Sequence, residues 1–273
     1  MTAVFSWKKH GGLTLHEAWL WTGAVHYARR AGMRAVLVAD PPARALLVDR
    51  LKLPFDEVLP LPFIPEEIEH VRDLTKLHAL RLLLARGEAA IHVDFDVFFG
   101  QPLPAHLLAA AFCGEFWYAT RPFLARVNDS LIVSRHQPPP LRCVAGGIMG
   151  GNDIAGILAV CDESIRIALL PENRPALCAA NGYQASVLLG EAAFGAAFPT
   201  AAILLPRGNT CAEDYRARGY VHLAGNKASA MKMHHAAELV RRDFPQDFME
   251  VFLRWSCEKQ QACVAGTGRL LAR

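Results

Sequence analysis

The first third of the chain alternates short apolar runs with longer stretches of helical spacing. Thr2–Ser6 and Arg34–Ala39 have the length and continuous apolar character of buried strands. Residues 14–31 and 43–51 place apolar side chains at helical intervals. Because strands that alternate with helices are joined by crossovers, this order predicts an α/β fold with a parallel or mostly parallel sheet covered by helices.

The first of these helices carries a signal at each end. Thr14 and Glu17 form a capping box, in which the hydroxyl accepts from an amide three residues on and the carboxylate reaches back. Gly32 is expected to end the helix. Both helix boundaries are therefore predicted from local chemistry alone.

The rest of the chain continues the pattern. Further strands are expected at 54–65, 89–93, 116–120, 201–205 and 221–223, and further helices at 74–86, 154–170, 183–193 and, broken at Pro245, 235–257. The segment VAGGIMGG at 144–151 is too rich in glycine for an ordinary strand, and a tight turn with bulges is one interpretation of it. We find no repeat or linker, which predicts a single domain.

Composition excludes several classes of protein. The chain has 273 residues, of which 52% are hydrophobic and 20% charged, as in a protein with a sizeable core. Its 29 basic and 26 acidic residues are interspersed, which predicts no nucleic-acid partner. The longest uncharged stretches, 97–114 and 192–206, contain proline and glycine, so no transmembrane segment is expected.

The ends and the cysteines bear on location. Lys8 and Lys9 come too early for the hydrophobic region of a signal peptide. Seven cysteines without a C-x-x-C pair are expected to be reduced thiols. These features predict a cytoplasmic protein, with peripheral association with the inner membrane face left open.

The strongest chemical feature is the run from His92 to Asp96 at the end of a predicted strand. In an extended chain alternate residues share a face, so His92, Asp94 and Asp96 point one way. Paired carboxylates suit a divalent cation such as Mg²⁺ or Mn²⁺, and ligands bind at the carboxyl ends of strands in open α/β sheets. We therefore predict a metal site at Asp94 and Asp96, with His92 as an open question and a pair of solvated turn aspartates as the alternative.

Two later segments offer complementary chemistry. His222 could complete the coordination of a metal, although a lone histidine is more often an ordinary strand-end residue. Gly225 would allow the backbone to approach a ligand, and Lys227 could neutralise a diphosphate. The glycines of 145–151 would permit contact with a sugar or phosphate, but they do not form the dinucleotide pattern G-x-G-x-x-G.

Taken in order, these segments resemble the GT-A-type nucleotide-sugar glycosyltransferases, and most closely family 8, which includes glycogenin and bacterial lipopolysaccharide galactosyltransferases. The matching segments are Thr75-Lys76, DFDVFFGQPL at 94–103, Ala145-Gly146-Gly147, Asn181-Gly182-Tyr183-Gln184 and His222-x-x-Gly225-x-Lys227. Val144 replaces the family's asparagine before Ala-Gly, and His92 is unusual before the D-x-D, which is typical of a divergent relative, expected to be bacterial.

The resemblance implies a fold and a reaction. The fold is α/β, a single GT-A-like (Rossmann-related) domain over residues 1–273 with a central, mostly parallel mixed sheet flanked by helices. Its nucleotide- and metal-binding half would be 1–120, and its acceptor and catalytic half 121–273. The reaction is metal-dependent transfer of a sugar from a nucleoside-diphosphate sugar, expected to be a UDP-sugar, with retention. The acceptor would be a carbohydrate, a lipid-linked molecule or a protein.

The resemblance also implies roles for individual residues. Asp94, Asp96 and His222 would hold Mn²⁺ (or Mg²⁺), and the catalytic group would comprise Gln184 near the anomeric carbon and Asn181. Apart from the resemblance, an inverting enzyme would need a carboxylate base, for which Asp153 or Asp129 is the candidate. The substrate-binding residues would be Phe5, Ser6, Trp7, Lys76, Ala145, Gly146, Gly147, Gly225 and Lys227.

Two other functions are compatible with the sequence. A sugar nucleotidyltransferase needs similar metal chemistry, but only Lys8-Lys9-His10-Gly11-Gly12 approaches the glycine-rich basic loop of such enzymes. A catalytically inactive GT-A-like binding protein is the second alternative. A binding protein has no need to keep a complete metal and leaving-group set, which argues against it.

Overall fold

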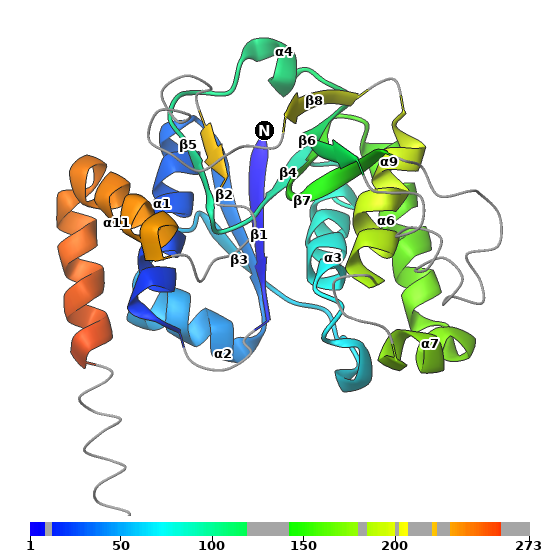
Figure 1. Cartoon of the computed structure of the whole chain (residues 1–273), viewed down its shortest axis with the longest axis horizontal. Coiled ribbons are helices and arrows are strands. Elements are labelled where there is room, and N and C mark those ends of the chain that lie inside the picture. The colour runs from blue at the N-terminus through cyan, green and yellow to red at the C-terminus, as the bar shows by residue number, and fades with distance from the viewer. Residues whose placement is uncertain are drawn as a thin grey trace, which may run out of the picture.

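A seven-stranded sheet with helices on both faces forms the centre of the computed structural model (Figure 1). The structure describes residues 1–8, 13–118, 142–179, 185–199, 202–206, 220–222 and 230–257. The strands are β1 (Thr2–Trp7), β2 (Arg34–Ala39), β3 (Glu57–Pro60), β4 (Ala90–Val93), β6 (Phe112–Tyr118), β7 (Arg142–Gly151) and β8 (Ala202–Pro206). Their order is β3-β2-β1-β4-β7-β6-β8, and of these strands β7 alone runs against the others. The predicted α/β class with a mostly parallel mixed sheet is confirmed.

Helices cover both faces of this sheet (Figure 1). On one face lie α1 (Leu15–Arg30), α2 (Pro41–Arg44) with its π-helical continuation η1 (Ala45–Arg50), and α11 (Ala230–Asp243). On the other lie α3 (Asp73–Leu84), α6 (Ile154–Leu169), the π-helix η4 (Val187–Ala192) and α9 (Ala193–Ala197). The shorter helices are η2 (Glu66–Ile68), α4 (Ala105–Leu108), η3 (Pro171–Asn173) and α7 (Arg174–Ala179), and residues 245–257 are helical after the predicted break.

The helix α1 has the boundaries that its sequence predicts. The amide of Glu17 donates to the hydroxyl of Thr14 at 3.2 Å, and the amide of Thr14 donates to the carboxylate of Glu17 at 2.9 Å. Gly32 follows the helix with a φ of 80°, a left-handed conformation in which glycine carries no steric cost. The first crossover is therefore fixed by local interactions.

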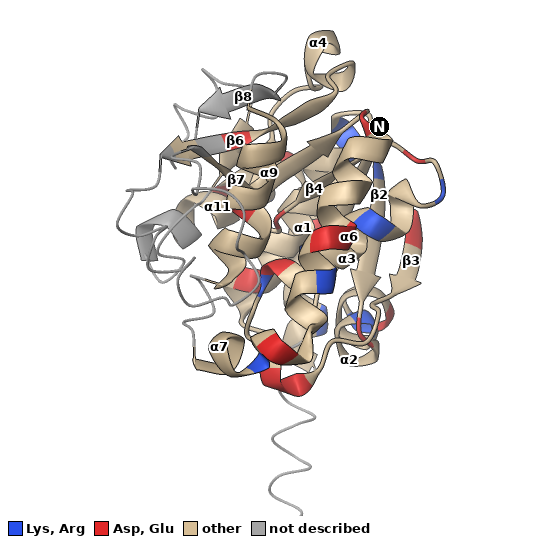
Figure 2. Ribbon diagram, turned by 90° about the vertical axis from the view of Figure 1, so that its right-hand side faces the viewer, with Lys and Arg blue, Asp and Glu red and all other residues tan. Residues whose placement is uncertain are grey.

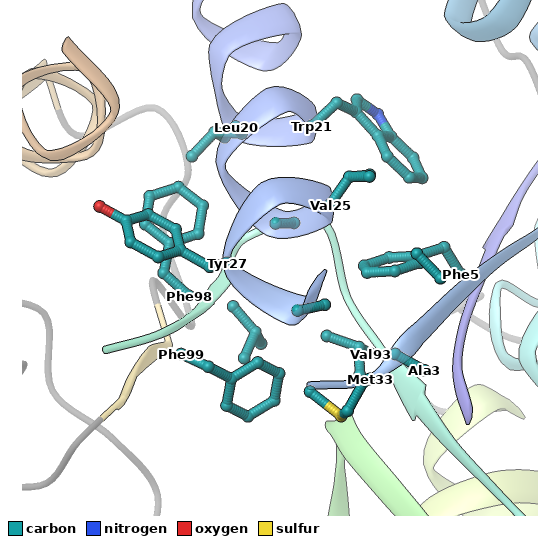
Figure 3. Close-up of a cluster of buried hydrophobic side chains, with 14 of the residues drawn as sticks. Ala3, Phe5, Leu20, Trp21, Val25, Tyr27, Met33, Val93, Phe98 and Phe99 are labelled. Atoms are coloured by element: carbon teal, nitrogen blue, oxygen red, sulfur yellow. The ribbon is translucent and has the colours of Figure 1, made fainter. Parts of the chain in front are cut away.

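Alternate residues of the central strands enter two separate cores. Ala3 and Phe5 of β1 pack on the α1 face, whereas Val4 packs on the face covered by α3 and α6. Figure 3 shows the first core, where Phe5 lies 6.2 Å from Trp21, centroid to centroid, and Tyr27 stacks on Phe98. Burial on both faces explains why these strands are continuous apolar runs.

The glycine-rich segment at 144–151 is a strand and not a turn, so the expectation that it holds too much glycine for a strand is wrong. It belongs to the ten-residue strand β7, which pairs antiparallel with β4 and β6. A Cβ on Gly150 would lie 2.2 Å from the carbonyl oxygen of Ala90, and one on Gly151 would lie 2.4 Å from that of Ala111. The φ values of these two glycines, 148° and 158°, are also ones that other residues rarely adopt. Glycine is needed here because neighbouring backbone approaches the strand closely.

Other differences from the predicted elements are small. The strand expected at 116–120 begins earlier, at Phe112, and has a bulge between Gly114 and Glu115. The helix expected at 43–51 is divided between α2 and η1. The short strand expected at 221–223 is β9 (Tyr220–His222), which lies outside the main sheet.

Charged positions are mixed on the face that α6 and α7 present in Figure 2. One ion pair joins the two large helices of this face, with Arg81 Nε of α3 at 2.5 Å from Asp162 Oδ1 of α6. Within the described parts of the chain, no helix combines the length and the apolar character that crossing a bilayer requires.

Candidate metal site

The two aspartates of the D-x-D lie in a turn at the carboxyl end of β4. The amide of Asp94 donates to the carbonyl of Gly147 at 2.9 Å, and the amide of Val97 donates to the carbonyl of Asp94 at 3.1 Å. Phe95 points to the other side and stacks on Trp21 at 5.0 Å between centroids. The prediction that the strand pleat aligns the carboxylates is therefore wrong for Asp96, which the turn brings into place.

A second, two-stranded sheet brings His222 to this turn. The strand β5 (Val97–Phe99) pairs antiparallel with β9, and Val97 is the partner of His222. This register places Nε2 of His222 3.7 Å from Oδ1 of Asp96. Segments far apart in the sequence thus meet directly after the D-x-D.

Asp94, Asp96 and His222 form a group that could hold a metal ion. Each offers one ligand atom, and these three atoms lie within 4.8 Å of one another. Divalent cations of the first transition row bind both carboxylate and imidazole ligands. The three residues predicted as ligands are therefore brought together, at the edge of an open α/β sheet where ligands usually bind.

His222 is held from behind by a carboxylate that was not predicted from the sequence. Nδ1 of His222 hydrogen-bonds with Oε2 of Glu115, which is completely buried in β6. Burial alone would lower the pKa of His222, but the charges of Glu115 and Asp96 outweigh it and raise the pKa. A single carboxylate between aromatic and small residues in the strand FCGEFWY was the available signal.

Lys76, in the first turn of α3, reaches the same edge of the sheet. Its Nζ lies 3.1 Å from Oδ2 of Asp94, 3.0 Å from the carbonyl of Gly146 and 3.5 Å from Oδ1 of Asp73. Although burial opposes it, the carboxylates of Asp94, Asp73 and Glu191 raise the pKa of Lys76, so the side chain is a cation at neutral pH. Lys76 therefore meets the metal group as a partner of Asp94, and its contact with a nucleotide stays a prediction.

Two further carboxylates lie beside Lys76, the buried Asp73 and the half-buried Glu191. Burial raises the pKa of Asp73, and burial together with the charge of Asp73 raises the pKa of Glu191 to about 7. Glu191 accepts from the amide of Gly146 at 3.1 Å and from Nε1 of Trp117 at 2.6 Å. Neither acid was predicted, because each lies in a helical segment where a single carboxylate is ordinary.

The raised pKa of Glu191 predicts a pH dependence of stability. Since its pKa is about 7 in the folded chain against an ordinary value of 4.5, the folded state binds the proton more tightly than the unfolded state. As the pH rises from about 4.5 to about 7, the free energy of unfolding of the wild type should therefore fall relative to that of Glu191→Gln. The total loss should be about 3 kcal/mol, and the difference should stay constant above about pH 7. Urea unfolding of both proteins at about pH 5 and about pH 8 measures this difference. An equal pH dependence in both proteins would contradict it.

At the end of β1, which was expected to contact a nucleotide, Phe5 and Trp7 pack on the core and Ser6 lies beside the site. Phe5 is completely buried in the α1 core, and this placement does not support its predicted contact with a substrate. Trp7 is half-buried and packs on Trp21 at 5.7 Å between centroids. The hydroxyl of Ser6 shares a hydrogen bond of 3.0 Å with Nε2 of His92.

His92 lies beside the metal group and not in it. Its Nδ1 is 4.0 Å from Oδ1 of Asp94. Burial lowers the pKa of His92 to about 3 against the opposing charge of Asp94, so the ring is neutral. Among the described residues, the group whose ligand atoms lie within 4.8 Å of one another comprises Asp94, Asp96 and His222 only.

The backbone of 145–147 is largely engaged within the protein. Ala145 is buried opposite Glu115 in the β6–β7 ladder. The carbonyl of Gly146 accepts from Lys76, and that of Gly147 accepts from the amide of Asp94. These residues build the metal site from behind, and their predicted contact with a sugar stays a prediction.

Asp153 lies near the amino end of β4, whereas the metal group lies at its carboxyl end. Because β7 runs antiparallel to β4, its end at Gly151 pairs with Ala90, at the start of β4. The carboxylate of Asp153 accepts from the amide of Gly156 at 2.9 Å and caps α6. This placement does not support its predicted role as a base.

The remaining predicted residues lie outside the described part of the chain. They are Asn181, Gln184, Gly225, Lys227 and Asp129. Residues 9–12 of the loop considered for a nucleotidyltransferase are also outside it, and Lys8 pairs with Glu69.

Comparison with known proteins gives no sequence relative and a distant structural likeness. No family model matches the chain, and no curated protein matches it. Among solved structures, the chain is similar to the galactosyltransferase LgtC in complex with donor and acceptor sugar analogs, at 13% identity and a TM-score of 0.43 over 92% of this chain and 100% of that one. It is also similar to an active site mutant of LgtC, at 12% identity and a TM-score of 0.43 over 92% of this chain and 100% of that one.

Proposed function

We propose that this chain is a metal-dependent glycosyltransferase. It would move a sugar from a nucleoside-diphosphate sugar, with UDP as the carrier, to a carbohydrate, lipid-linked or protein acceptor, with retention at the anomeric carbon. The observation that carries the proposal is the convergence of Asp94, Asp96 and His222 at the carboxyl edge of a mostly parallel sheet. The order of motifs from Lys76 to Lys227 supports the reaction class.

The donor set favours Mn²⁺ over Mg²⁺. Mg²⁺ takes oxygen ligands almost exclusively, whereas imidazole is a ligand for transition metals. His222 supplies the nitrogen and the aspartates the oxygens. When bound, the ion would neutralise the charge that develops on the diphosphate as it leaves the sugar.

The chain's own residues prepare this site before a donor binds. Lys76 holds one oxygen of Asp94 at 3.1 Å and is itself tied to the carbonyl of Gly146, so Asp94 has a fixed orientation. Its positive charge also reduces the repulsion between the carboxylates and an incoming diphosphate. We propose that Lys227 neutralises the leaving diphosphate, and that Gln184 and Asn181 contact the sugar.

Linked binding of Mn²⁺ and UDP tests the proposal. Since Asp94, Asp96 and His222 would hold the ion that neutralises the diphosphate, UDP should raise the melting temperature strongly only when Mn²⁺ is present. At a UDP concentration of about 100 times its dissociation constant, the added stability is about 2.7 kcal/mol, or several degrees for a domain of this size. Thermal unfolding with each ligand alone and with both measures the linkage. A UDP effect of equal size with and without Mn²⁺ would contradict the metal-dependent binding.

A further inference from the structure

Behind the imidazole of His222 lies a buried contact that the proposed ligand set does not include. Nδ1 of the ring hydrogen-bonds with Oε2 of Glu115, while Nε2 lies 3.7 Å from Oδ1 of Asp96. Glu115 is 0% exposed and His222 is 5% exposed. One ring nitrogen therefore hydrogen-bonds with a buried carboxylate, and the other faces the aspartates of the metal group.

The backbone of β7 holds the ring from another side. A Cβ on Gly147 would lie 2.1 Å from Cε1 of His222 and 2.6 Å from Nε2, so the imidazole lies directly against the strand. The pairing of β5 with β9 fixes the position of the His222 backbone. With backbone and ring face both restrained, the hydrogen bond to Glu115 decides which nitrogen carries the proton.

Burying the carboxylate of Glu115 costs free energy, and the packing around it does not explain why a charged residue lies there. Burying a carboxylate is unfavourable unless its charge is paired and hydrogen-bonded. In the strand FCGEFWY, an apolar residue at this position would avoid that cost. The hydrogen bond with His222 explains why a carboxylate is buried at this position.

We propose that Glu115 is a positioning residue for the metal group, an inference that rests on the proposed metal-dependent function. Its carboxylate keeps the proton of the neutral ring on Nδ1, so that the lone pair of Nε2 is free to bind an ion that Asp94 and Asp96 would hold. Carboxylate–histidine pairs of this kind orient metal-binding histidines and raise their basicity, and losing the carboxylate typically weakens metal binding 10–100-fold.

Mn²⁺ titration of three variants tests this role. Glu115→Leu should weaken binding of Mn²⁺, measured by electron paramagnetic resonance, on the order of 10–100-fold. Glu115→Gln keeps an acceptor for Nδ1–H and should lose less than about tenfold. Glu191→Gln changes a half-buried carboxylate whose hydrogen bonds go to Gly146 and Trp117, and it should bind Mn²⁺ within about threefold of the wild type.

A spectroscopic readout makes the test independent of how well the variants fold. In alkaline solution, ring nitrogen shifts of ¹⁵N-labelled wild type should show His222 protonated on Nδ1, with the signal assigned by its loss in His222→Asn. Protonation on Nε2 would overturn the inference. If the wild type binds Mn²⁺ and Glu115→Leu binds it as tightly, only the positioning role is overturned. If the wild type binds no Mn²⁺, the proposed function fails and the inference fails with it.

Discussion

Replacing Asp96 by alanine is expected to reduce the turnover of a nucleotide-sugar on the order of 10³-fold. Stabilising the charge of a leaving diphosphate through a cation contributes several kcal/mol, and each 1.36 kcal/mol corresponds to a factor of ten in rate. Asp96 is 1% exposed and lies beside His222, so its carboxylate belongs to the deepest part of the metal group. Hydrolysis of a panel of UDP-sugars with Mn²⁺, followed by release of UDP, measures the loss.

Two matched variants separate the chemistry from folding. Asp96→Asn keeps the size of the side chain and removes the negative charge, so it should lose nearly as much turnover as the alanine variant while unfolding close to the wild type. Asp49→Ala removes an exposed aspartate of η1, far from the site in the sequence, and should leave turnover unchanged. Wild-type turnover in both Asp96 variants would remove Asp96 from the metal group.

Turnover also distinguishes the proposed transferase from an inactive binding protein. Both would show linked binding of Mn²⁺ and UDP, because the ligand triad alone suffices for it. Only an enzyme would release UDP from a nucleotide-sugar in a manner that depends on Asp96. The binding and turnover experiments therefore answer different questions.

Elements with local signals were predicted to within a residue or two. The capping box of Thr14 and Glu17 and the glycine at 32 define α1, and a continuous apolar run defines β2. In each case the determining interactions lie within the segment. The hydrogen bonds of a cap and the burial of an apolar run leave a trace that a sequence shows directly.

The strand β7 was missed because the reason for its glycines is tertiary. Gly150 and Gly151 lie against the backbone of neighbouring strands, and Gly146 and Gly147 make room for Lys76 and His222. No local pattern distinguishes these demands from those of a loop. A glycine-rich segment between a predicted strand and a predicted helix is therefore not sufficient to predict a turn.

The candidate site shows the same division. Asp94 and Asp96 were predicted from their place after an apolar strand, and His222 joined them through the family resemblance. Glu115 and Glu191 escaped prediction because their partners, His222 and Trp117, are remote in the sequence. Only the pairing of β5 with β9 and the order of the central strands bring these groups together.

Gly147→Ala is expected to weaken Mn²⁺ binding at least about 100-fold. The new Cβ would lie 2.1 Å from Cε1 of His222, a distance at which one of the two groups must move. The ring is held by Glu115 on one side and by the backbone pairing of β9, so the simplest response is to turn Nε2 away from Asp96. Loss of one of three ligands explains the size of the effect. Mn²⁺ titration by electron paramagnetic resonance measures it.

Gly146→Ala is the matched control on the same strand, because its Cβ would meet the end of a flexible side chain. That Cβ would lie 2.7 Å from Nζ of Lys76, which can shift by rotation about its methylenes, whereas an imidazole ring cannot yield in this way. Gly146→Ala should therefore lose less than about tenfold in Mn²⁺ affinity. If Gly147→Ala, like Gly146→Ala, loses less than about tenfold in Mn²⁺ affinity, His222 is not a ligand and the metal group reduces to the two aspartates. If Gly147→Ala alone loses the ion while its unfolding remains cooperative, the orientation of the imidazole is what makes the site.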